Sequence, residues 1–163
     1  IDTHGGSIRV YAAKKGKFKI NKNVNKILHF EKKFLNWKTF NNFKKRVVSS
    51  KIHLYSILKQ LKNNKKKIYG IGAPSRASTL INYVGLDENI IDCVLEVDGS
   101  YKIGNYIPGK KIPILSEKQL YNNPPDYVIL FSWHITSELK LNLKKKGYKG
   151  KFIIPLPSPR IET

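Results

Sequence analysis

The spacing of the apolar residues changes near position 64 of the chain. Between Val24 and Leu61 the apolar side chains recur mostly every three or four positions, which is the period of an α-helix with one buried face. Beyond Asn64 they come in short, nearly continuous runs bounded by glycine, proline and polar residues, which indicate strands covered on both faces. The pattern predicts one long helix, or two, followed by an α/β region. We expect the helical stripe, including Trp37 and Phe40, to pack against that region or against a further domain.

Strands and helices alternate in the second region. The apolar runs predict strands at residues 67–72, 90–97, 111–115, 127–131 and 151–154, before a proline-rich tail. Helices are predicted at residues 76–84, from 116 onward and at 135–146, with Ser116 and Gln119 at capping-box spacing and Gly147 ending the last helix. This order is typical of an α/β fold with a doubly wound parallel sheet.

Residues 65–84 read as a strand, a glycine turn and a helix in immediate succession. Gly70 and Gly72 are expected to let the backbone bend tightly and approach a ligand, and Ser75 is expected to cap the helix. The free N–H groups at the start of that helix favour an anion, so the turn suggests nucleotide binding. A purely structural turn is the alternative, because Ser75 stands where a dinucleotide motif has its third small residue.

A second loop is expected to meet this turn. In a doubly wound sheet the ligand crevice opens where the winding direction reverses, usually between the first and fourth strands. That rule brings Ser75 and Arg76 towards Ser132 and His134, which follow the fourth strand. We interpret His134 as a base or a phosphate ligand, with a helix cap as the alternative.

Two further candidates lie near the second strand. Glu96 follows Gly72 by about 24 residues, close to the usual spacing of a ribose-binding acid, although a solvent-facing strand end has the same signature. The loop at residues 98–108 offers Tyr101, Lys102 and Tyr106 for contacts with a sugar or a base. The same loop is also consistent with an ordered Ω-loop held by its own aromatic rings.

Composition narrows the classes of function. The formal net charge is +20, but only four of the 31 basic residues are arginine, so we do not expect nucleic acid as the partner and retain only a general attraction for anions. The single cysteine, Cys93, excludes an intrachain disulfide and a cysteine-cluster zinc site and suits a reduced core thiol in the cytoplasm. No apolar run approaches the length of a membrane helix. The sequence also shows no carboxylate pair, metal-ligand cluster or serine nucleophile elbow.

The pattern divides the chain into three parts. Residues 1–13 contain a glycine turn and a short alternating stretch, Ile8, Val10 and Ala12, which we interpret as the last strand of a preceding domain. Residues 14–64 form a basic linker and the helical segment, and residues 65–163 form the α/β domain. The chain has no methionine and begins with Ile1, so we expect it to be a piece of a longer polypeptide.

Four motifs together resemble a known family. Residues 4–11, 72–83, 104–114 and 132–133 are similar, in order and spacing, to the C-terminal region of S-adenosylmethionine-dependent sugar C-methyltransferases. The resemblance covers nearly the whole chain. It implies a three-part parent protein with a small zinc-binding N-terminal domain, a central methyltransferase domain and a C-terminal Rossmann-like domain. Members of the family methylate a ring carbon of nucleotide-linked keto-deoxysugars.

The resemblance also implies roles for this chain. It would be the Rossmann-like C-terminal domain, inactive alone, that contributes substrate contacts and scaffolding beside the preceding methyltransferase domain. S-adenosylmethionine and zinc would be held elsewhere in the parent. The candidate contacts to the nucleotide-linked sugar are Gly72, Ala73, Pro74, Ser75, Arg76, Tyr101, Lys102, Tyr106, Ser132, Trp133 and His134.

Two departures and two rival hypotheses accompany this interpretation. The family usually has asparagine at the position of His134, and an Asp-x-x-Pro-x-Lys run where this chain has residues 96–102. These differences concern which sugar nucleotide is bound. A stand-alone module that binds a nucleotide, dinucleotide or acyl-coenzyme is the first rival, and an inert scaffold with a vestigial turn is the second.

Overall fold

The computed structural model describes residue 1 and residues 6–163. The chain divides into two units, Ile1–Val47 and Val48–Thr163. Helix α2 (Trp37–Asn63) contributes to both, with its N-terminal part in the first unit and the rest in the second. The helical segment consists of two helices, α1 (Lys22–Phe34) and α2.

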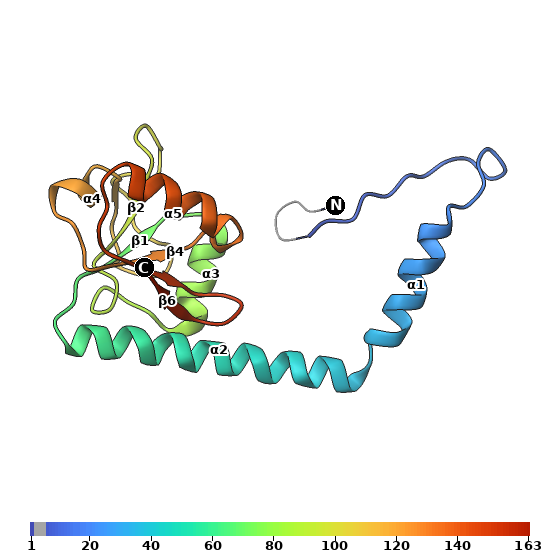
Figure 1. Cartoon of the computed structure of the whole chain (residues 1–163), viewed down its shortest axis with the longest axis horizontal. Coiled ribbons are helices and arrows are strands. Elements are labelled where there is room, and N and C mark those ends of the chain that lie inside the picture. The colour runs from blue at the N-terminus through green and yellow to red at the C-terminus, as the bar shows by residue number, and fades with distance from the viewer. Residues whose placement is uncertain (2–5) are drawn as a thin grey trace. The chain divides into compact units, whose positions relative to one another are not determined.

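The second unit alternates strands and helices after α2 (Figure 1). In chain order these elements are β1 (Ile68–Ile71), α3 (Ser75–Val84), β2 (Cys93–Glu96), β3 (Ile114–Ser116), α4 (Gln119–Asn122), β4 (Tyr127–Leu130), the 3-10 helix η1 (Trp133–Ile135), α5 (Thr136–Lys145), β5 (Lys151–Ile154) and β6 (Arg160–Glu162).

The described strands form one six-stranded sheet in the order β3-β2-β1-β4-β5-β6. The first five are mutually parallel, and β6 runs antiparallel to β5. Each of the five parallel strands was predicted, although β2 begins three residues later than expected and β3 is shifted towards Ser116. The fold prediction is thus confirmed, whereas the proline-rich tail contains a strand, β6, that was not predicted.

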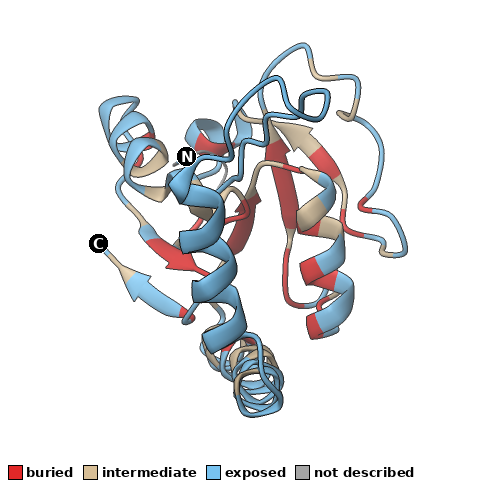
Figure 2. Cartoon of the chain, turned by 90° about the vertical axis from the view of Figure 1, so that its right-hand side faces the viewer, coloured by how far each residue is buried: buried red, intermediate tan, exposed pale blue. Residues whose placement is uncertain are grey.

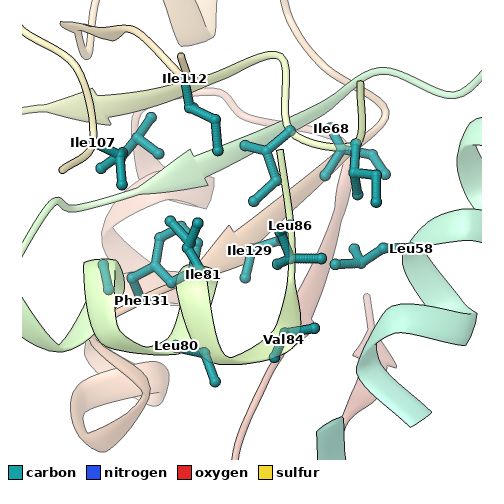
Figure 3. Close-up of a cluster of buried hydrophobic side chains, with 14 of the residues drawn as sticks. Leu58, Ile68, Leu80, Ile81, Val84, Leu86, Ile107, Ile112, Ile129 and Phe131 are labelled. Atoms are coloured by element: carbon teal, nitrogen blue, oxygen red, sulfur yellow. The ribbon is translucent and has the colours of Figure 1, made fainter. Parts of the chain in front are cut away.

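Alternation along the strands separates two buried layers. In β1, Ile68 belongs to the cluster that also contains residues of α2 and α3, while Tyr69 belongs to the cluster with residues of α4 and α5. Figure 3 shows the first cluster, with Leu58 of α2 next to Leu86 and with Ile81 of α3 next to Phe131. Both faces of the sheet are therefore covered by helices, as parallel strands require.

Both predicted serine caps are wrong. Ser75 is the first residue of α3, and the cap position is Pro74, which provides no side-chain hydrogen bond. Helix α4 is only four residues long, and Ser116 does not cap it. The Ser116 hydroxyl instead donates to Asp98 and accepts from the N–H of Lys118, so it closes a local turn in front of the helix.

The first unit presents apolar side chains to solvent. Helix α1 begins after Asn21, whose side chain accepts a hydrogen bond from the N–H of Asn23 (2.9 Å), and Figure 2 shows it exposed along its length. The large exposed side chains of α1 and the following residues are Val24, Ile27, Leu28, Phe30, Phe34, Leu35, Trp37, Phe40 and Phe43. The strand predicted over Ile8, Val10 and Ala12 is wrong for this chain, because residues 6–13 form neither helix nor strand. The glycine turn predicted before it lies partly outside the described residues, and the origin of residues 1–13 in a preceding domain stays a prediction.

Cys93 lies in the core, as predicted. Its thiol is buried and free, and burial raises its pKa to about 12, so it remains protonated and unreactive at neutral pH. None of the helices in the part of the chain that the structure describes has the length and apolar content needed to cross a lipid bilayer.

Candidate functional site

The turns that follow β1 and β4 lie beside each other at one edge of the sheet. The two strands are paired up to Ile71 and Leu130, and the N–H of Phe131 donates to the C=O of Ile71 (3.1 Å). Parallel strands end at the same edge, so the turn at Gly72 faces the segment that begins at Ser132. A Cβ added to Gly72 would lie 3.5 Å from the Ser132 Oγ. The predicted meeting of the two loops at the switch point is confirmed.

The two glycines of the turn motif have different functions. Gly72 has φ +79, and its N–H donates to the C=O of Leu95 (2.8 Å), so it supplies the left-handed conformation that the turn requires. Gly70 lies inside β1, where an added Cβ would overlap the ring of Phe131 and lie 2.9 Å from Cγ2 of Val94. Gly70 therefore makes room for the core rather than for a ligand, which corrects the expectation that both glycines shape the turn.

Side chains from outside the turn hold both polar groups of Ala73. Its N–H donates to Oε1 of Glu96 (2.7 Å), and its C=O accepts from Nζ of Lys102 (2.9 Å). The Lys102 Nζ also lies 3.6 Å from the same Glu96 Oε1. Glu96 ends β2, the strand next to β1, whereas Lys102 comes from the loop after β2. The structure thus places Ala73 and Lys102, both predicted site residues, in direct contact.

Arg76 connects α3 to the segment after β4. Its Nη1 lies 2.9 Å from Nδ1 of His134, and its Cζ lies 5.7 Å from the centroid of the Trp133 ring. Because a guanidinium has no acceptor, Nδ1 of His134 accepts in this contact. His134 belongs to the 3-10 turn η1 and does not cap α5. Arg76, Trp133 and His134 therefore form one cluster. The approach of Arg76 to His134 was predicted, whereas the contact with the Trp133 ring was not.

The start of α3 offers backbone donors beside this cluster. Within the described residues, the N–H groups of Ser75 and Arg76 have no hydrogen-bond acceptor. The N–H of Ala77 donates to the C=O of Pro74 (2.8 Å). Two unused N–H groups at the positive end of a ten-residue helix, next to the guanidinium of Arg76, form an arrangement that suits a phosphate.

The loop after β2 places its predicted residues in different environments. Lys102 reaches the turn, as described above, whereas Tyr101 and Tyr106 are 88% and 61% exposed. In the described part of the chain neither tyrosine ring makes a ring contact or a side-chain hydrogen bond. The loop is anchored elsewhere, by the side chain of Asn82, which donates to the C=O of Pro108 (3.0 Å), and by the buried Ile107. Among the described residues, Lys102 is thus the residue of this loop whose side chain is shown to contact the turn.

Asp98, two residues after Glu96, forms an ion pair with Lys118 (3.0 Å). The hydrogen bond from Ser116 and then that from Lys118 lower the pKa of Asp98, so this exposed acid stays ionised near neutral pH. In residues 1 and 6–163, no group of three or more histidine, cysteine or acidic side chains is placed to hold a metal ion.

The contact between Glu96 and Ala73 is the feature that sequence reasoning missed. Glu96 was interpreted as a ribose-binding acid or as a solvent-facing strand end. In the structure it instead accepts a hydrogen bond from the backbone N–H of Ala73. The spacing between Gly72 and Glu96 identifies an acid at the end of the second strand. It does not identify the donor that this acid accepts from, because a carboxylate accepts equally from a backbone N–H and from a ribose hydroxyl.

Two comparisons with known proteins agree with this architecture. The family described as "C-methyltransferase C-terminal domain" matches residues 2–157. The chain is also 30% identical over 164 residues to "C-methyltransferase NovU" of Streptomyces niveus. That alignment covers 98% of this chain and 39% of the relative, so the chain spans about two fifths of the length of the protein it matches.

Proposed function

Because the chain belongs to the C-methyltransferase C-terminal domain family, we propose that it is the substrate-side domain of a methyltransferase that acts on a nucleotide-linked keto-deoxysugar. The family match and the name of the relative support methyl transfer to carbon in the parent protein. The observation that carries substrate binding here is the cluster of Arg76, Trp133 and His134 beside the open N-terminus of α3.

The phosphates of the sugar nucleotide are proposed to bind at this cluster. The N–H groups of Ser75 and Arg76 would donate to one phosphate, while the Arg76 guanidinium supplies a fixed positive charge. The cation–π contact with Trp133 and the contact with His134 already orient that guanidinium. A pre-oriented side chain loses less conformational entropy when a ligand binds, which favours affinity. Ser132 lies opposite Gly72 and would border the phosphate site next to the turn.

The sugar or the base is proposed to extend towards the loop after β2. Lys102 carries a positive charge at the turn, and Tyr101 and Tyr106 present exposed rings on the same loop. Aromatic faces and fixed donors suit a sugar or a nucleobase. In this proposal the loop contributes by closing onto bound substrate, and the tyrosines make no contribution to the free domain.

The methyl transfer itself is assigned to the rest of the parent. S-adenosylmethionine would supply the methyl group there, and we assign both this cofactor and the zinc ion to preceding domains. No residue of this chain is assigned to either group, and we expect the chain alone to be inactive.

Calorimetric titration of this chain tests substrate binding. A deoxythymidine diphosphate sugar is expected to bind selectively over NAD and S-adenosylmethionine, with weaker binding at higher salt because the phosphate contacts are ionic. Arg76→Ala should weaken binding by about 10–100-fold, since it removes a charged donor. Arg46→Ala is the matched control, because Arg46 is an exposed arginine of α2.

Three other outcomes have distinct meanings. Preferential binding of NAD that depends on Arg76 would support the stand-alone dinucleotide module instead. Binding that appears only when the preceding domain is present would mean that the site is shared with that domain. Absence of binding in the full-length parent, with Arg76→Ala unchanged in activity, would support the inert scaffold.

The apolar surface of the first unit supports the scaffolding role. We define the docking surface as the exposed residues Val24, Ile27, Leu28, Phe34, Leu35, Trp37, Phe40 and Phe43. Large exposed apolar side chains concentrated on neighbouring helices mark an interaction site. The relative extends well beyond the region that this chain matches, and we propose that the preceding methyltransferase domain covers the docking surface.

Hydrogen exchange distinguishes this partner from a second copy. In a parent protein that includes the preceding domain, the amides of residues 22–47 should exchange at least about tenfold more slowly than in this chain alone. The amides of β4 serve as the control, because they are buried in the α/β unit in either case. Protection that instead rises with the concentration of this chain alone would assign the surface to self-association.

A further inference from the structure

The carboxylate of Glu96 contacts two other residues of the candidate site, Ala73 and Lys102. Its Oε1 accepts from the N–H of Ala73 at 2.7 Å and lies 3.6 Å from the Lys102 ammonium. The side chain is largely buried at the end of β2, next to the strand that leads into the turn. One carboxylate oxygen thereby joins three segments of the chain, namely the end of β2, the turn after β1 and the loop after β2.

The closed arrangement fixes the peptide that precedes α3. Glu96 holds the N–H of Ala73, and Lys102 holds its C=O at 2.9 Å. Gly72, immediately before, needs φ +79, and Pro74, immediately after, restricts the conformation of Ala73. The turn therefore has little freedom while both side chains remain in place, so the N–H groups of Ser75 and Arg76 keep their direction.

The same contacts limit what Glu96 can offer to a ligand. An acid at the end of the second strand reads ribose hydroxyls in dinucleotide-binding folds. Here Oε1 is already occupied by Ala73, and the neighbouring Lys102 ammonium lies beside it. A ribose that used both carboxylate oxygens would have to share Oε1 with the Ala73 N–H, close to the Lys102 ammonium. If it displaced the N–H instead, a buried donor would lose its acceptor, which is costly.

We infer that Glu96 is the positioning residue of this site, holding Ala73 and Lys102 for an anionic ligand, and that it does not read a ribose. The identity of the ligand in this inference rests on the proposed sugar-nucleotide function. The contacts of Glu96 are those of the chain without ligand. We expect the domain to discriminate against dinucleotides, because the acid that they require is engaged by the turn.

Three variants test the inference: Glu96→Ala, Glu96→Gln and the control Glu88→Gln. Glu88 is an exposed acid in the turn between α3 and β2, so its substitution makes the same charge change away from the contact with Ala73. Glutamine keeps an oxygen that accepts from the Ala73 N–H, whereas alanine removes it. The exchange rate of the Ala73 amide, followed by NMR in the free chain, reads the contact without any ligand.

The expected results form a graded series. In Glu96→Ala the Ala73 amide should exchange about tenfold faster or more, and the deoxythymidine diphosphate sugar should bind about tenfold more weakly. In Glu96→Gln the amide should stay protected and affinity should remain within about threefold of wild type. Glu88→Gln should match wild type in both measurements. The β4 amides, compared in every variant, confirm that the sheet is folded.

Two results would overturn the inference. The first is an unchanged Ala73 exchange rate in Glu96→Ala, which would show that the contact does not order the turn. The second is wild-type binding of NAD that both Glu96 variants abolish while binding of the sugar nucleotide is unaffected. If wild type binds no sugar nucleotide, the proposed function fails for this chain, and the Ala73 exchange rate still decides the positioning role.

Discussion

Helix α2 carries one apolar spacing but has two different environments. In its C-terminal part, Leu54 and Leu58 are buried in the core of the α/β unit, with Leu58 at 0% exposure. In its N-terminal part, within the first unit, Phe40 is 52% exposed and Phe43 is exposed as well. The comparison teaches that helical periodicity identifies the face that needs a partner. It does not tell whether that partner is in the same chain.

The largest expected effect separates the two parts of α2 by stability. Leu58→Ala should lower the free energy of unfolding by about 3 kcal/mol, because it removes buried methyl groups and leaves a cavity. Phe40→Ala should change it by less than about 0.5 kcal/mol, since the ring contributes little buried area in this chain. Urea unfolding followed by circular dichroism measures both. Equal losses would mean that the N-terminal part of α2 is packed in solution.

A second comparison concerns the two glycines of the turn motif. Gly70 is surrounded by core side chains, whereas Gly72 has space around it. Gly70→Ala should destabilise the fold by about 1–3 kcal/mol, because the new methyl group overlaps Phe131 and Val94 in the core. Gly72→Ala should cost about 1 kcal/mol, since its Cβ has space and the penalty is only that of a positive φ. Thermal and urea unfolding test the order of the two losses.

A further variant checks the cause of the Gly70 effect. If overlap with the ring is responsible, Phe131→Leu should restore part of the stability lost in Gly70→Ala, giving a favourable coupling energy in a double-mutant cycle. Additive losses would instead point to a change in the backbone of β1. The same cycle with Gly72→Ala should show no coupling to Phe131, because the added Cβ lies nearest to Ser132 and Pro74.

The sheet was predictable because strand burial leaves a direct mark on the sequence. Runs such as residues 127–131 are apolar at every position, since the two sets of alternate side chains enter two different cores. Strand β6 left no such mark. It has three residues, lies at an antiparallel edge and follows prolines. Its Glu162 side chain accepts from the Lys140 ammonium of α5 at 2.7 Å, which attaches the strand to that helix.

The candidate site was predictable to the level of which loops meet. The strand order, and hence the approach of Arg76 to His134, follows from topology and from the alternation of elements. The side-chain hydrogen bonds did not follow, because sequence spacing does not specify which donor and acceptor come into contact. The Ala73 N–H donates to Glu96, and the Ser116 hydroxyl donates to Asp98 and does not cap a helix. Competition among local acceptors is decided by three-dimensional geometry, which sequence spacing does not encode.

The smallest expected effect concerns an acid that connects strand ends in the α/β unit. Asp126 accepts from the N–H of Lys67 (2.8 Å) and lies 3.4 Å from the Lys66 ammonium. The hydrogen bond from the Lys67 backbone is the main cause that lowers the pKa of Asp126. A lowered pKa stabilises the fold above the unfolded value of about 3.9, and this stabilisation is lost as the pH falls through the folded value.

Replacing that acid should therefore flatten the acid limb of the stability curve. Asp126→Asn should cost less than about 1 kcal/mol at pH 7, because the side chain is 42% exposed and water screens its charge. Below about pH 4 the difference from wild type should shrink, since the wild-type carboxylate becomes protonated as well. Urea unfolding between about pH 2 and pH 7 measures the curve, with Glu88→Gln as the matched change of an exposed acid. A constant difference across this range would mean that Asp126 acts through its shape and its acceptor oxygen, and that its charge contributes nothing to the stability of the α/β unit.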